Sequence, residues 1–159
     1  MLKLIATTFL GLMVLASSAT ADMTETIARH EKDTSWLFIS SANGLSFDGT
    51  TVTLSEVSPH IVMFTDRPRR VAEAVPVQAF VDGWTKGGDE SFQKDPPNAG
   101  FTVWAYGAYQ VSVVEISDPV YDGQKLSFKV KPVEGQLPKS GEHTSVFIDG
   151  GCSPWDPRC

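Results

Sequence analysis

The sequence predicts a mainly β fold, either an antiparallel β-sandwich or a partly closed barrel, with one short inserted helix. Two observations lead to this prediction. Seven or eight short segments rich in strand-forming residues follow one another closely, and turn signals such as Asp48-Gly49 and Asp122-Gly123 separate them. Strands this close in sequence leave no room for parallel crossovers, except across the helix, so the pairing should be antiparallel.

The first half of the chain contains the early strands. We expect a strand over residues 36–41, a hairpin formed by 45–47 and 52–54 around Asp48-Gly49, and an apolar strand from His60 to Thr65. Asp-Gly between alternating apolar and polar residues is among the stronger hairpin signals. Pro68 cannot donate a ladder hydrogen bond and ends the last of these strands.

A helix is predicted next. Its apolar side chains recur at i, i+3, i+4 and i+7, which is one helical face: Val77, Phe80, Val81 and Trp84. Pro76 suits the first helical position and Gly87 suits the end, which gives roughly ten residues. A helix of that length is not stable alone, so Phe80 and Trp84 should pack on the sheet.

Strand patterns then return over residues 101–105, 109–116, 126–130 and 145–148, with a polar loop at 136–144. Trp104 is out of phase with Val103 and Ala105, so it should point to the other face of the sheet, beside Tyr106. We expect the helix to cover that face. The alternative is an exposed aromatic pair that binds sugar rings or another protein.

Residues 1–21 have the three parts of a cleavable signal peptide. A basic start at Lys3 precedes an apolar run from Leu4 to Ala16, and small residues stand at Ala19 and Ala21. The run is shorter than the about 20 residues that span a bilayer, so we expect no membrane span after cleavage. The prediction is a periplasmic or secreted protein whose residues 22–149 form one β-rich domain.

The net charge indicates which partners to expect, and the position of the two cysteines indicates how they are bonded. A formal net charge of −6 makes nucleic acid a poor partner. Cys152 and Cys159 should form a disulfide that closes the tail of residues 150–159, because nearby thiols pair in an oxidising compartment. A redox or metal-binding pair is the alternative, although the spacing is not Cys-x2-Cys.

The predicted binding site follows the strand at residues 60–65. Asp66, Arg67 and Arg70 lie there, and Asn98 on a second loop is their expected partner. Charged residues on loops at strand ends often bind ligands, and arginine suits carboxylate or phosphate. The alternative is that Asp66 pairs with an arginine and only shapes the turn. Asn98, after Asp95-Pro96-Pro97, could likewise be only a rigid corner.

No motif for catalysis, metal or cofactor stands out. The chain lacks Gly-x-Ser-x-Gly, His-Glu-x-x-His and a glycine-rich phosphate loop, and Asp89, Glu90 and Asp95 do not match a calcium loop. We therefore expect no cofactor, and a non-enzymatic domain that binds a small anionic ligand or a protein partner. Two alternatives remain: a hydrolase or metal enzyme built from His60, Asp66 and His143, and an envelope component that binds protein through Trp104 and Tyr106.

A set of short motifs runs through the chain. Trp36 comes first, followed by Phe64-Thr65-Asp66-Arg67-Pro68, Phe80 to Trp84, Ser91-Phe92, residues 95–99 (Asp-Pro-Pro-Asn-Ala), Asp118-Pro119 and Phe147-Ile148-Asp149. This succession resembles a group of uncharacterised, exported bacterial proteins. The resemblance covers most of residues 22–149 but not the tail. It implies an exported location and the domain limits, and it implies no activity.

Overall fold

The computed structural model describes residues 35–65, 70–86, 88 and 91–150. The predicted signal peptide (1–21), Asp66, Arg67 and the Cys152–Cys159 pair lie outside the described residues. Within them the fold is mainly β, as predicted, with one antiparallel sheet and one short helix. The strands are β1 (Trp36–Phe47), β2 (Thr51–Val57), β3 (His60–Thr65), β4 (Ala72–Pro76), β5 (Asn98–Ala105), β6 (Ala108–Tyr121), β7 (Lys125–Glu134) and β8 (Ser140–Gly150), and the helix is α2 (Val77–Gly83).

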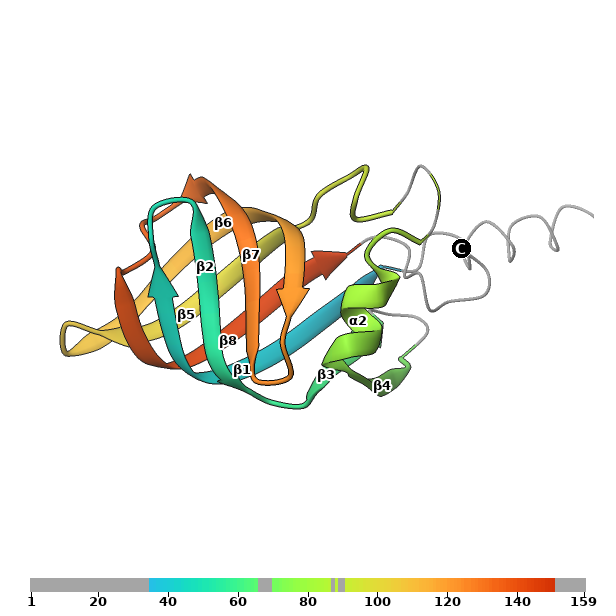
Figure 1. Cartoon of the computed structure of the whole chain (residues 1–159), viewed down its shortest axis with the longest axis horizontal. Helices are drawn as coiled ribbons and strands as arrows, with labels where there is room; N and C mark the ends of the chain where they lie inside the picture. The colour runs from blue at the N-terminus through green and yellow to red at the C-terminus, as the bar shows by residue number, and fades with distance from the viewer. Residues whose placement is uncertain (1–34, 66–69, 87, 89–90, 151–159) are drawn as a thin grey trace, which may run out of the picture.

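The sheet curls into a partial ring rather than a closed barrel. Its strand order is β2-β7-β6-β5-β8-β1-β3-β4, and β2 also pairs with β1. The second half of β1 pairs with β2, from Ala42 to Phe47, whereas its first half pairs with β3, from Trp36 to Ile39. The ring therefore closes over only part of its length, and β3 and β4 extend from it as a flap (Figure 1).

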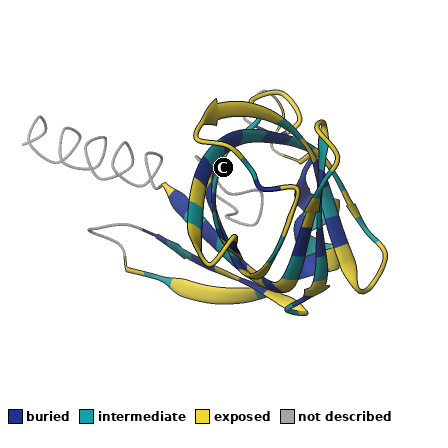
Figure 2. Cartoon of the chain, turned by 90° about the vertical axis from the view of Figure 1, so that its left-hand side faces the viewer, coloured by how far each residue is buried: buried dark blue, intermediate teal, exposed yellow. Residues whose placement is uncertain are grey.

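Buried apolar residues alternate with exposed ones along the strands, and the buried side chains form the core inside this ring. The alternation is visible in Figure 2, and the buried hydrophobic residues form one core cluster. The largest fully buried side chains include Phe38, Phe101, Phe128, Leu54 and Ile116. A period of two along an antiparallel strand gives one buried and one wet face, which is how these sequences specify the inside of the ring.

The helix lies at one end of the ring, where its apolar face packs on the sheet (Figure 1). Val77, Phe80 and Trp84 are buried, as the sequence predicts, but the helix has seven residues and not ten. Phe80 contacts Phe38, Trp84 and Phe92 at ring-centroid distances of 5.3, 5.7 and 6.4 Å. These aromatic rings close this end of the interior and supply the packing that a helix of seven residues needs.

Two predictions of local structure are wrong, and one strand is not predicted at all. That strand is β4, over residues 72–76. The polar loop predicted at residues 136–144 is shorter, because β8 begins at Ser140. The helix does not cover Trp104: this side chain stays 40% exposed on the outer face of the sheet. Within the described ranges, no helix is both long and apolar enough to cross a membrane.

Candidate functional site

Of the predicted site residues, the structure describes Arg70 and Asn98. Arg70 is exposed with a positive φ of 54°, and Asn98 is the exposed first residue of β5. Both lie at the same end of the sheet, because Thr65 pairs with Trp36, Trp36 with Gly150, and Ala99 with Ile148. However, β1 and β8 separate β3 from β5, and three steps between strands span about 14 Å. No contact between Arg70 and Asn98 is present in the described structure.

The β3–β4 turn is closed by backbone and hydroxyl groups. The Thr65 amide donates to the Val71 carbonyl oxygen at 2.9 Å, and the Val71 amide donates to Thr65 Oγ1 at 2.9 Å. The Arg70 side chain takes no part in these bonds. Whether Asp66 and Arg67 bind a ligand there stays a prediction, because both residues lie outside the described ranges.

A cavity of about 500 Å³ opens at the ring end opposite the helix, where the sequence predicts no site. This volume falls within the range of small-molecule pockets. The end of β1, the β1–β2 turn, β6, β7 and the β7–β8 loop line it: Phe47, Asp48, Gly49, Val114, Pro132, Gly135, Gln136, Leu137 and Lys139. The β7–β8 loop crosses this mouth of the ring (Figure 2).

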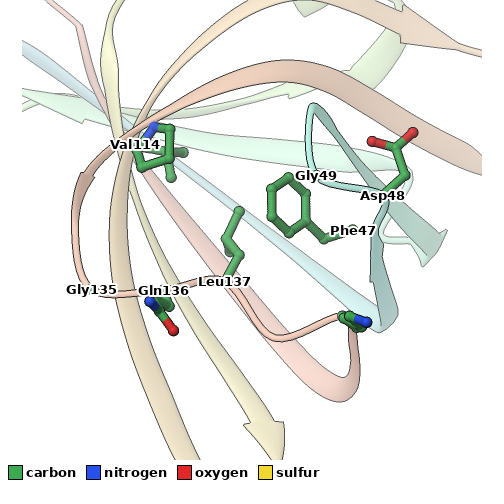
Figure 3. Close-up of a pocket in the computed structure, with 9 residues that line it drawn as sticks. Phe47, Asp48, Gly49, Val114, Gly135, Gln136 and Leu137 are labelled. Atoms are coloured by element: carbon green, nitrogen blue, oxygen red, sulfur yellow. The ribbon is translucent and has the colours of Figure 1, made fainter.

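The β1–β2 turn is held by Asp48. Its Oδ1 accepts hydrogen bonds from the Thr50 amide (2.8 Å), the Thr51 amide (2.7 Å) and Thr50 Oγ1 (3.0 Å). These bonds, led by that from the Thr51 amide, lower the pKa of the Asp48 carboxyl below its usual 3.8. The carboxylate thus forms its hydrogen bonds within the turn. It points away from the hollow between Phe47 and Leu137 (Figure 3).

Gly135 fixes the path of the β7–β8 loop. Its φ is +72°, and a Cβ at this position would lie 2.7 Å from the Val111 carbonyl oxygen and 3.2 Å from Ser112 Cα. Only glycine fits this backbone conformation and this close approach to β6 without a shift. Four residues later, the Phe47 amide donates to the Lys139 carbonyl oxygen at 2.9 Å, which ties the loop to β1.

The wall of the cavity is apolar and its rim carries a cation. Phe47 and Leu137 point toward each other across the opening (Figure 3), and both are partly buried against the core. Val114, 2% exposed, and Pro132 complete the apolar wall. Lys139 is exposed, and the ion pairs between described residues involve Lys129 and Lys131 instead. Lys139 therefore has no ion-pair partner within the described part of the chain.

The alternative enzyme hypothesis requires His60, Asp66 and His143. The two of these residues that the structure describes lie on different strands. His60 begins β3 and His143 lies on β8, with β1 between the two strands. Among described residues, no group of three His, Cys, Asp or Glu side chains could hold a metal ion. An enzyme built from these residues would need Asp66, which lies outside the described ranges.

The cavity could not have been located from the sequence. Asp48-Gly49 signals a turn and Gly135 signals a kink, but neither says that the two segments meet. They meet because β1 pairs with β8 from Trp36 to Ser46 and bends far enough to pair with β2. Comparison with known proteins adds no relative: no protein-family model, no curated protein and no solved structure matches the chain.

Proposed function

We propose that this protein is an exported, non-enzymatic binding protein whose ring-end cavity holds a small amphipathic anion, such as a medium-chain carboxylate. The observation that carries the proposal is an apolar cavity of about 500 Å³ whose rim carries Lys139, which forms no ion pair with the described residues. The signal-like pattern of residues 1–21 supports the exported location.

The apolar wall would supply most of the affinity. A hydrocarbon chain placed between Phe47 and Leu137 would remove apolar surface from water on both sides. Each CH₂ group buried in this way contributes about 0.8 kcal/mol. The opposite end of the ring is filled by the aromatic side chains under the helix, so the chain would enter only from this mouth.

Lys139 would set the preference for an anion. Asp48, the other charged residue of the wall, uses its carboxylate in the turn and directs it away from the opening. An ion pair at an exposed rim contributes roughly 0.2–1 kcal/mol. Charge thus adds selectivity to binding that apolar contact drives.

Calorimetric titration with octanoate, and with octanol as the uncharged counterpart, tests this proposal. We expect Lys139→Gln to weaken octanoate binding by about two- to fivefold and to leave octanol binding unchanged. Leu137→Asn should weaken both ligands by about tenfold, since it removes apolar contact. Lys94→Gln is the matched control, because Lys94 is also an exposed lysine but is not part of the cavity wall.

Each variant is first checked for native circular dichroism and cooperative unfolding. If neither ligand binds the unmodified protein, the proposed function is wrong. If both ligands bind and Lys139→Gln changes neither affinity, the cavity binds apolar molecules and the assigned role of Lys139 is wrong.

A further inference from the structure

A second feature lies on the outside of the sheet, away from the cavity wall. Trp104 of β5 and Tyr109 of β6 are register partners whose rings meet edge to face, with centroids 5.1 Å apart and planes at 71°. Trp104 is 40% exposed and Tyr109 is 60% exposed. Together they form an open corner with two aromatic walls, which we call the aromatic corner.

The strands force both rings outward. Phe101, Val103 and Ala105 alternate with Trp104 and are buried inside the ring, so the tryptophan between them must face solvent. The hairpin turn that joins β5 to β6 has positive φ at Tyr106 (56°) and Gly107 (81°), which is the tight two-residue geometry that matches sheet twist. The aromatic corner therefore sits beside the tight turn of a regular antiparallel hairpin.

Glu142 lies on β8, which flanks β5 on the side opposite β6. It is the register partner of Trp104, and cross-strand partners share a face of the sheet. The preceding residue, Gly141, faces the interior, since a Cβ there would lie 2.4 Å from Val103 Cγ1. Glu142 must then face outward, and in the described part of the chain its carboxylate has no hydrogen-bond or ion-pair partner.

We propose that the aromatic corner and Glu142 form a binding site for an organic cation that carries a trimethylammonium group. A cation over the faces of tryptophan and tyrosine is attracted by their ring electrons, and quaternary ammonium groups are recognised in this way. Glu142 adds an opposite charge beside Trp104. Two rings at 71° suit a compact, rounded cation better than one flat sugar ring, which needs a single platform.

The surrounding charges favour the same ligand. β5, β6 and β8 carry no lysine or arginine, so no permanently charged cation on these strands competes for the rings or repels a ligand cation. The chain as a whole has a formal net charge of −6, which raises the local concentration of cations.

Two-dimensional NMR of the indole N–H of Trp104 measures this binding, and the Trp104→Leu variant identifies the signal. The probes are choline and its uncharged isostere 3,3-dimethylbutan-1-ol. We expect choline to shift the Trp104 signal in a saturable way and the isostere to shift it far less. Tyr109→Leu and Glu142→Gln should each weaken choline binding by about two- to fivefold.

Phe147→Leu is the matched control. Phe147 is 46% exposed on β8 but pairs with Gly100, away from the corner, and its loss should leave choline binding unchanged. If the isostere shifts the Trp104 signal as strongly as choline, the corner is only an apolar patch and the proposal is overturned. Absence of any shift overturns it as well. Lys139→Gln should have no effect, which separates this site from the cavity.

Discussion

Replacement of Gly135 by alanine tests how the cavity loop is held. Two costs add at this position. A residue other than glycine at φ +72° costs roughly 1–2 kcal/mol, because Cβ crowds the following carbonyl oxygen. The new Cβ would also lie 2.7 Å from the Val111 carbonyl oxygen, and relief of such overpacking typically costs about 1–3 kcal/mol. We therefore expect Gly135→Ala to lower the free energy of unfolding by about 2–5 kcal/mol.

Gly107→Ala separates these two costs. Gly107 has a similar φ of +81°, but a Cβ at this position would meet no atom within 4 Å. This control should lose only the conformational part, roughly 1–2 kcal/mol. Urea unfolding gives both free energies, and in thermal unfolding the extra loss at Gly135 should appear as a midpoint lower by roughly 4–12 °C. Equal destabilisation of the two variants would refute the close approach of this loop to β6.

Three further predictions concern the interior, the aromatic end and the turns. Thr144→Val should stabilise the protein by about 1 kcal/mol in urea unfolding, because the Thr144 hydroxyl is buried without a partner in the described structure; destabilisation would reveal a hidden partner. Phe80→Ala should cost about 3–5 kcal/mol, against less than about 1 kcal/mol for the exposed Phe147→Ala, and similar losses would contradict the packing under the helix. Asp48 and Asp122 have lowered pKa values, chiefly through the Thr51 and Gln124 amides, so their stabilisation is complete above pH 3.8 and is lost as pH falls through the lower folded values. Unfolding midpoints measured across this range should fall less steeply when both residues are asparagine, and an unchanged pH dependence would show that other carboxylates dominate.

The fold class follows from the sequence because local signals carry it. Alternation in residues such as Leu126, Phe128 and Val130 marks a strand with one buried face, and Asp122 before Gly123 marks the turn before it. The helical face of Val77, Phe80 and Trp84 is equally local. Each of these signals depends on neighbours within a few residues, so one sequence suffices to detect it.

Strand limits and pairing depend on distant residues and are predicted less well. β8 begins at Ser140 in a polar stretch because β1 continues to Phe47 and offers partners as far as Ser46. A positive φ at His143 lets the strand change faces along this stretch, which breaks the alternation that sequence-based prediction relies on. The sequence pattern predicts Trp104 under the helix, but the helix packs on Phe38 at the end of the ring instead.

The candidate site is the least predictable part. A cluster of arginines in a turn is visible in the sequence and suggests a binding site. A cavity formed between two ordinary turns leaves no local pattern in the sequence. Lys139 and Leu137 line the cavity only because the backbone conformation at Gly135 directs their loop across the ring toward Phe47. Closure of the ring by the β1–β2 and β1–β8 pairings, and not the loop sequence alone, creates the site.

An NMR titration of isotope-labelled protein with octanoate tests the central claim most directly. Backbone amide signals report where the ligand binds without any prior choice of site. We predict saturable shifts at Phe47, Gly135, Leu137 and Lys139, and unchanged signals at Asn98. Shifts confined to Arg70 and Asn98 would place the site at the other end of the sheet, and no saturable shift at all would contradict the proposed function.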